Sequence, residues 1–88
     1  MWFVYLIQSK ANKEKYIGFT QDIERRLNEH NSGISKYTSR QAGYWELIYF
    51  EAYKSEQDAL IREKRLKEHG KAKQELYKRL DNSILKQL

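Results

Sequence analysis

Two tyrosines near the start of the chain are the first side chains from which a reaction centre could be built. Tyr5 and Tyr16 lie in two short runs of β-branched and aromatic residues, and ten residues separate them. A phenol becomes a better proton acceptor when positive charge nearby favours its anionic form. Gly18, two residues beyond Tyr16, would leave the backbone open to the close approach of a phosphate. Such a centre needs a source of positive charge elsewhere in the chain.

An arginine, a histidine and a glutamate further along could complete the centre. Arg26 and His30 are four residues apart, so on a helix they share one edge. An arginine offers a charged planar fork to a phosphate and to the negative charge that develops during its hydrolysis. Glu63 falls on the apolar stripe of a predicted helix, where a carboxylate is costly unless it is paired or bound to a cation.

Each of these residues, taken alone, also has an ordinary structural interpretation. The tyrosines could be half-buried strand residues, Arg26 a solvated helix residue and His30 a surface imidazole. Glu63 could simply pair with Arg62, Lys67 or a residue of a neighbouring strand. It is their joint order and spacing that favours a site.

The elements that must position these side chains follow from hydrophobic periodicity and turn residues. Strands are expected over residues 2–8, 15–19 and 45–53, and helices over residues 21–31, 56–68 and from residue 71 onward. A polar link rich in turn formers joins the first two strands, which predicts a β-hairpin. The order β-β-α-β-α-α fits an α+β fold in which helices flank a small three-stranded antiparallel sheet.

Capping residues define the expected ends of the helices. Thr20 is expected to cap the first helix and Gly33 to close it. Ser55 is expected to cap the second helix and Gly70 to end it. The apolar residues expected to be buried are, helix by helix, Ile23 and Leu27; Ala59, Leu60 and Leu66; and Leu76, Tyr77 and Leu80. Ile84, Leu85 and Leu88 could extend the packing of the third helix, or the end of the chain could fray.

The amino-acid composition indicates a globular protein without disulfide bonds. The 88 residues are 40% hydrophobic and 33% charged, which indicates one globular domain over residues 1–88. The absence of cysteine excludes a disulfide framework and a thiolate metal site. The apolar run at the N-terminus is too short for a membrane-spanning helix and lacks the basic leader of a signal peptide. We therefore expect a soluble, cytoplasmic protein with no membrane partner.

Positive charge suggests a polyanionic partner. The net charge is +5, and basic residues are concentrated between Arg62 and Arg79. A loop expected over residues 31–43 adds Lys36 and Arg40, with Tyr37 between them. This loop could contact phosphates and stack on a base, or it could be solvated with its tyrosine packed on the sheet.

The hairpin motifs resemble those of the GIY-YIG nuclease family. Phe3-Val4-Tyr5 stands where the family's first motif would be, with Phe3 in place of the motif's glycine. Tyr16-Ile17-Gly18 matches the second motif without change, and the ten-residue gap is the family's usual spacing.

The later positions match as well. Arg26 corresponds to the motif arginine, His30 to a position where relatives carry histidine or tyrosine, and Glu63 to the acidic metal ligand. The segments over residues 29–33 and 36–38 look like those of the small stand-alone members of UPF0213 type. The resemblance covers nearly the whole chain.

The resemblance implies a metal-dependent endonuclease that acts on DNA, including the structured or damaged DNA of DNA repair. Glu63 would bind Mg²⁺ or Mn²⁺, with water and phosphate oxygens completing the coordination shell. Tyr5 would act as the base and Tyr16 would hold the water or phosphate. Arg26 would contact the phosphate, and His30 would orient Tyr5 or relay its proton. The residues expected to contact nucleic acid are Gly18, Lys36, Tyr37 and Arg40.

Two other functions stay open at this point. The chain could be a nucleic-acid-binding module with little or no turnover, or a structural domain whose charge aids solubility. A binding module has no use for Glu63, because a carboxylate repels phosphate unless a metal intervenes. The choice between DNA and RNA, between nicking and double-strand cleavage, and the oligomeric state also stay open. A monomer with one such site would cut one strand at a time.

Overall fold

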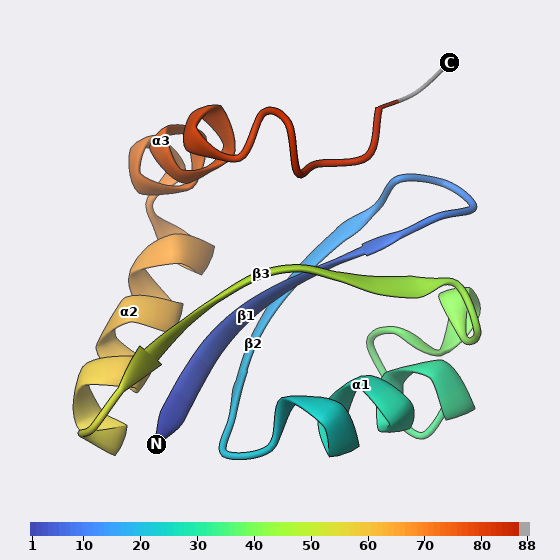
Figure 1. Cartoon of the computed structure of the whole chain (residues 1–88), viewed down its shortest axis with the longest axis horizontal. Coiled ribbons are helices and arrows are strands. Elements are labelled where there is room, and N and C mark those ends of the chain that lie inside the picture. The colour runs from blue at the N-terminus through green and yellow to red at the C-terminus, as the bar shows by residue number, and fades with distance from the viewer. Residues whose placement is uncertain (87–88) are drawn as a thin grey trace.

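The computed structural model describes residues 1–86 and confirms the predicted α+β fold. The elements follow the order β-β-α-β-α-α (Figure 1). They are β1 (Trp2–Ser9), β2 (Lys15–Thr20), α1 (Ile23–Ser32), a 3-10 turn (Ser39–Gln41), β3 (Trp45–Tyr53), α2 (Glu56–Glu68) and α3 (Gly70–Arg79).

The sheet is antiparallel, with β1 in the centre and the strand order β2-β1-β3. Because β1 is covered on both faces, its run from Val4 to Ile7 is buried throughout and shows no polar alternation. The register pairs Tyr5 with Gly18 of β2, and Ile7 with Tyr16. Both phenols therefore lie on one face of the hairpin, as the sequence predicts.

The two faces of the sheet carry different helices. Val4 and Leu6 pack with Ala59 and Leu66 of α2 and with α3. The alternate residues of β1, Tyr5 and Ile7, pack on the opposite face with Trp45 and with α1. In Figure 1, α1 lies below and to the right of the strands, whereas α2 and α3 lie to their left and above. The two tyrosines thus face α1.

The start of α1 differs from the prediction. Asp22, and not Thr20, is the N-cap, and its carboxylate accepts from the backbone N–H of Arg25 at 3.0 Å. Thr20 is the last residue of β2, and its Oγ1 accepts from the N–H of Asp22 at 3.1 Å. This hydrogen bond stabilises the turn between β2 and α1. Gly33 closes the helix in the left-handed conformation with φ 84°, which confirms it as the expected end.

The junction of α2 and α3 also corrects the sequence interpretation. Ser55 caps α2 as predicted, but Gly70 opens α3 instead of ending α2. The turn is made by His69, which has an extended backbone, so no left-handed glycine is needed. Leu60 is 39% exposed because the buried stripe of α2 runs through Ala59 and Leu66, which lie two turns apart.

The end of the chain returns to the central strand. The buried side chain of Gln8 accepts from the N–H of Leu85 at 2.7 Å and donates to its carbonyl at 3.2 Å. Leu85 is therefore docked, while Leu88 lies outside the described residues. Within residues 1–86, no helix is long and apolar enough to cross a membrane.

Candidate active site

Tyr5 crosses directly over Gly18 on the neighbouring strand. Its side chain is 3% exposed, and a Cβ added to Gly18 would come within 2.3 Å of its phenolic oxygen. The glycine is thus required by the position of the Tyr5 ring. Burial raises the pKa of Tyr5 to about 12, although the positive charge of Arg26 acts to lower it. The resting side chain is a neutral phenol.

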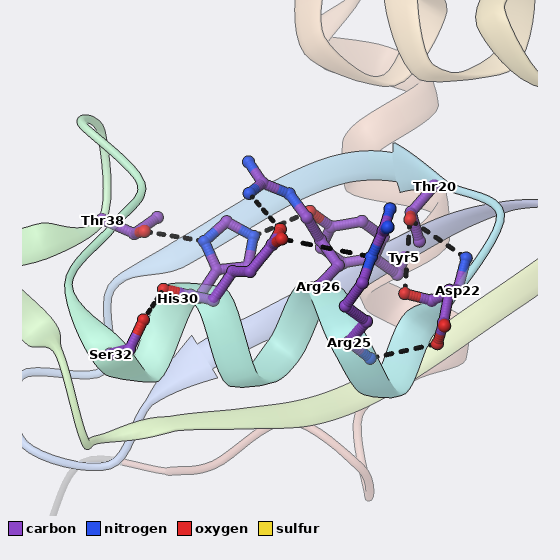
Figure 2. A network of polar contacts seen from close by, with 9 residues as sticks. Tyr5, Thr20, Asp22, Arg25, Arg26, His30, Ser32 and Thr38 are labelled. Atoms are coloured by element: carbon purple, nitrogen blue, oxygen red, sulfur yellow. Dashed lines mark hydrogen bonds and ion pairs between the residues drawn. The ribbon is translucent and has the colours of Figure 1, made fainter.

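His30 is the one fully buried residue of α1, so its interpretation as a surface imidazole is wrong. Its Nε2 lies 2.8 Å from the phenolic oxygen of Tyr5, and its Nδ1 lies 2.7 Å from Oγ1 of Thr38. Figure 2 shows the imidazole between these two hydroxyls. Burial, together with the charge of Arg26, lowers the pKa of His30 to about 4. The imidazole is therefore neutral at physiological pH.

Arg26 lies one helical turn before His30, on the edge of α1 that faces the buried pair (Figure 2). Its Nη1 donates to the carboxylate of Glu29 at 3.0 Å, and 28% of its side chain is exposed. The guanidinium is thus held in place while part of it stays accessible to a ligand. A partly exposed arginine beside a buried phenol is suited to receiving a phosphate.

Tyr16 and Glu63 approach the same region from β2 and α2. The Tyr16 ring lies 5.2 Å from that of His30. The ammonium of Lys67 lies 5.2 Å above the Tyr16 ring and 3.4 Å from Glu63 Oε2. The charge of Glu63 also acts to raise the pKa of Tyr5, so the carboxylate lies within electrostatic range of the phenol. Contacts thus link Tyr5 through His30, Tyr16 and Lys67 to Glu63.

A second polar network, which sequence reasoning missed, joins β3 to α2. The carboxylate of Glu51 on β3 accepts from the phenols of Tyr49 and Tyr53, each at 2.5 Å, and from Nε of Arg62 at 2.6 Å. Burial alone would raise the pKa of Glu51, but the hydrogen bonds from Arg62 and the tyrosines lower it overall. Tyr49, Glu51 and Tyr53 alternate along β3 and so share one face of the strand, but their contact with Arg62 of α2 depends on tertiary packing that the sequence does not show.

Residues 1–81 match the family model described as the GIY-YIG catalytic domain. The chain belongs to the GIY-YIG family. This domain implies a nuclease-like protein with a nucleic-acid partner, and the family generally uses divalent metal ions.

Small proteins of the UPF0213 group are the relatives of this GIY-YIG domain. It is 36% identical to the UPF0213 protein YhbQ of Escherichia coli over 74 residues, 84% of this chain and 73% of that one. It is 32% identical to a UPF0213 protein of Haloquadratum walsbyi over 73 residues, 83% of this chain and 81% of that one. The solution NMR structure of a UPF0213 protein from Bacillus halodurans matches with a TM-score of 0.51 and 32% identity. The match covers 86% of this chain and 83% of that one.

The side chain of Glu63 fits the single protein ligand of a hydrated divalent cation. Within the described part of the chain, no three histidine, aspartate or glutamate side chains gather into a site that could enclose a metal. Mg²⁺ keeps several waters and needs only one or two carboxylates from the protein. The ammonium of Lys67 lies 3.4 Å from Glu63 Oε2, so a metal ion held by this oxygen would compete with it.

In the loop that follows α1, some side chains lie at the surface and one is buried. Lys36, Tyr37 and Arg40 line a hollow of about 460 Å³ at the surface. Tyr37 is 81% exposed, so the alternative in which it packs on the sheet is wrong. Thr38 points inward and is buried. Its contact with His30 was missed because a hydroxyl in an irregular loop carries no periodic signal.

Proposed function

We propose that this GIY-YIG domain is a divalent-metal-dependent endonuclease that hydrolyses phosphodiester bonds in DNA. The observation that carries the proposal is the buried Tyr5–His30 pair, whose phenol is influenced by the charges of the partly exposed Arg26 and of Glu63. Structured or damaged DNA is the substrate class to examine first. The proposed catalytic residues are Tyr5, Tyr16, Arg26 and His30, with Glu63 as the metal ligand.

The chain's own residues would divide the work as follows. Arg26 binds the scissile phosphate through its planar donors and stabilises the charge that develops on it. Tyr5 would first give up its own proton, for which Nε2 of His30 at 2.8 Å is an available acceptor. Its phenolate, which the burial that raises its pKa makes a strong base, would then take the proton of the attacking water. Tyr16 borders the same space and positions the water or phosphate. A cation held by Glu63 would supply Lewis-acid stabilisation of the phosphate and the leaving oxygen.

The surrounding surface favours a polyanion. The chain carries a net charge of +5. Lys36, Tyr37 and Arg40 are exposed beside the loop that holds Thr38. These residues would contact the nucleic acid through phosphates and base stacking. Gly18, which lies buried beneath Tyr5, would take part only by making room for the phenol.

A nucleic-acid-binding module with little turnover is a second candidate, which the Glu63–Lys67 contact favours. The ammonium of Lys67 already neutralises the carboxylate at 3.4 Å, as it would in a domain that no longer binds a metal. In that case the domain would bind nucleic acid, and neither Mg²⁺ nor Mn²⁺ would produce cleavage.

Cleavage assays separate the two candidates. The protein is incubated with branched, nicked and single-stranded DNA and with RNA, in Mg²⁺ and in Mn²⁺, beside Arg26→Ala and Glu63→Ala. Arg25→Ala is the matched control, because Arg25 adjoins Arg26 but its side chain is 69% exposed. The endonuclease should cut at least one DNA substrate, and both site variants should lose about 100-fold or more in rate while the control does not.

The same experiment can refute the proposal. Equal cleavage by the wild type and both site variants would identify a contaminant. Binding without cleavage, with an affinity that falls steeply as salt rises, would establish the binding module instead.

A further inference from the structure

Residues 62–79, which form the second half of α2 and all of α3, carry the entire net charge of the chain. This segment has eight basic and three acidic residues, whereas the rest of the chain has nine of each. The net charge of +5 is therefore concentrated on two consecutive helices. Such a concentration marks the face to which a polyanion is drawn.

A hollow of about 530 Å³ is lined by side chains of α2 and α3, which follow one another at the left of Figure 1. Ala72 and the buried Leu76 contribute its apolar part. Its polar lining consists of Arg62, Arg65, Glu75, Lys78 and Arg79. Four cations and one carboxylate leave a local excess of positive charge. Since a water molecule occupies about 30 Å³, the hollow has room for an anion with part of its hydration shell.

Arg62 is fixed in position by the network around Glu51. Its Nε donates to the Glu51 carboxylate at 2.6 Å, and its Nη2 lies 3.5 Å from the same carboxylate. The phenols of Tyr49 and Tyr53 hold that carboxylate in turn. Within residues 1–86, Nη1 of Arg62 has no hydrogen-bond partner. A guanidinium that is already held loses little freedom when a phosphate binds to its remaining donors.

The other three cations of the hollow have no carboxylate partner among the described residues. Arg65, Lys78 and Arg79 are exposed, and none of them forms an ion pair in this part of the chain. Burial raises the pKa of Tyr49, and the charge of Arg79 acts against this increase. Arg79 therefore lies within electrostatic range of a phenol that holds Glu51. Three unpaired cations and one fixed guanidinium thus border the same hollow.

We propose that this α2–α3 hollow is a second phosphate site, which binds a backbone phosphate of nucleic acid outside the reaction centre. Arginine forks and a lysine ammonium are the groups that bind phosphate oxygens most strongly. The carboxylate of Glu75 belongs to the same lining and repels an anion, so it limits the affinity of the site. The inference rests on the nucleic-acid partner of the proposed function and does not require cleavage.

The α2–α3 hollow and the reaction centre lie toward opposite edges of the sheet. Consecutive residues of a helix point about 100° apart around its axis, so the side chains of Arg62 and Glu63 diverge. Arg62 meets Glu51 of the edge strand β3. Glu63 meets Lys67, whose ammonium lies over Tyr16 of the other edge strand, β2. The hollow should therefore contribute to the binding of a nucleic acid that extends past the reacting phosphate, and not to the chemical step.

Binding of a fluorescently labelled DNA duplex, measured by anisotropy in EDTA at several salt concentrations, tests the site without cleavage. Arg65→Gln/Lys78→Gln (the hollow variant) removes two charges from the α2–α3 hollow. Lys64→Gln/Lys71→Gln is the matched control, because it removes two exposed charges from the same helices outside the hollow. The hollow variant should weaken binding about tenfold and reduce the slope of log affinity against log salt by about 1–2. The control should weaken binding by less than about threefold, with an unchanged slope.

Glu75→Gln tests the same site with the opposite sign. Removing the carboxylate relieves the repulsion of a phosphate, so the duplex should bind about threefold more tightly. Glu68→Gln is the control, since Glu68 is an exposed carboxylate of α2 that does not line the hollow. It changes the net charge equally and should have little effect. This pair also decides the question if the hollow variant does not fold, as judged by circular dichroism.

Nitrogen-15 NMR distinguishes a backbone phosphate from free phosphate. Addition of the duplex should shift the amide signals of Lys78 and Arg79, and inorganic phosphate should produce the same shifts only at much higher concentration. Tight saturation of these shifts by inorganic phosphate, which the duplex does not displace, would identify a site for free phosphate and overturn the inference.

Two binding results would also overturn the inference. Equal losses of affinity in the hollow variant and its control would show a diffuse field with no site. An affinity of Glu75→Gln no greater than that of Glu68→Gln would show that no anion binds beside this carboxylate.

Cleavage in Mg²⁺ and in Mn²⁺ separates this inference from the proposed function. If the hollow variant loses affinity as expected but the wild type cuts no DNA, the endonuclease fails and the second phosphate site stands. If DNA is cut and the hollow variant binds and cuts as the wild type does, the site fails and the endonuclease stands. If both hold, the hollow variant should raise KM about tenfold and leave kcat nearly unchanged.

Discussion

Glu51 of β3 and Glu63 of α2 are two carboxylates that both lie near tyrosines, yet their surroundings differ. Glu51 accepts from two phenols and from Arg62, all within 2.6 Å. Among the described residues, Glu63 has one cationic neighbour, the ammonium of Lys67 at 3.4 Å. The exposed fractions of the two side chains are alike, at 16% for Glu51 and 18% for Glu63, so the difference lies in their hydrogen-bond partners. The first carboxylate is saturated with donors, and the second is open to a further ligand.

This difference separates a structural network from a reactive one. A carboxylate whose lone pairs are all satisfied stabilises one arrangement of the chain and has no capacity left for a substrate or metal. A carboxylate with free lone pairs costs little to leave in contact with water and can bind a cation. Among the described residues, the tyrosines near Glu51 act as donors to a fixed charge, whereas Tyr5 faces a neutral imidazole and a partly exposed arginine.

The largest expected effect comes from removing each charge in turn. Glu63→Gln should lower the rate of metal-dependent DNA cleavage by about 100-fold or more and change the free energy of unfolding by less than about 1 kcal/mol. Glu51→Gln should have the opposite pattern, with a loss of about 1–3 kcal/mol of stability and a cleavage rate close to wild type. Chemical denaturation and initial cleavage rates, measured on both variants, check that one variant loses activity and the other loses stability. Equal patterns in the two variants would remove the distinction between the networks.

The two regions should also respond to acid in different pH ranges. The pKa of His30 falls from 6.5 to about 4 on folding, so between these values the unfolded chain binds more protons than the folded one. Stability should therefore decrease by about 3 kcal/mol as the pH is lowered through this range. The titratable and charged groups that face His30 are Tyr5, Tyr16, Arg26 and Glu29.

Glu51 contributes at lower pH. Its pKa is held below the ordinary value of 4.5, so its stabilisation is present above that pH and is lost as the pH falls through its lowered pKa. Urea denaturation at a series of pH values, on the wild type and on His30→Gln and Glu51→Gln, resolves the two contributions. His30→Gln should abolish the decrease between pH 6.5 and about 4 and leave the lower one. An unchanged profile in His30→Gln would show that the imidazole titrates normally.

A smaller effect is expected from two glycine substitutions. Gly18→Ala places a Cβ 2.3 Å from the phenolic oxygen of Tyr5, so the ring must move. We expect a loss of about 1–3 kcal/mol of stability together with loss of cleavage. Gly70→Ala is the control, because a Cβ there meets nothing within 4 Å, and the lower entropy of the unfolded chain should stabilise the protein by up to about 1 kcal/mol. Equal thermal shifts in the two variants would contradict the close contact of Tyr5 with Gly18.

Local patterns were sufficient to predict the hairpin and the side chains that share one face of it. Alternation in the strands placed Tyr5 and Tyr16 on one face, and the helical spacing placed Arg26 beside His30. The strand bounds and the Ser55 cap followed from the same local rules.

Contacts between distant segments could not be predicted in the same way. Thr38 reaches His30 because Asn31 and Trp45 fix a loop that has no periodicity of its own. Glu51 meets Arg62 across a strand and a helix, in a pair that tertiary packing alone brings together. The start of α1 and the end of α2 differ from the predicted bounds. Asp22 caps α1 in place of Thr20, and His69 ends α2 in place of Gly70.

The contrast between the open and the saturated carboxylate is tested most directly by Mn²⁺ titration of nitrogen-15-labelled protein, with and without a short DNA duplex. Paramagnetic broadening of amide signals reports which residues lie near the bound ion. The account predicts that broadening begins around Glu63 and Tyr16, that residues around Glu51 are unaffected, and that Glu63→Gln abolishes the effect. Broadening centred on Glu51, or a pattern unchanged by Glu63→Gln, would contradict it.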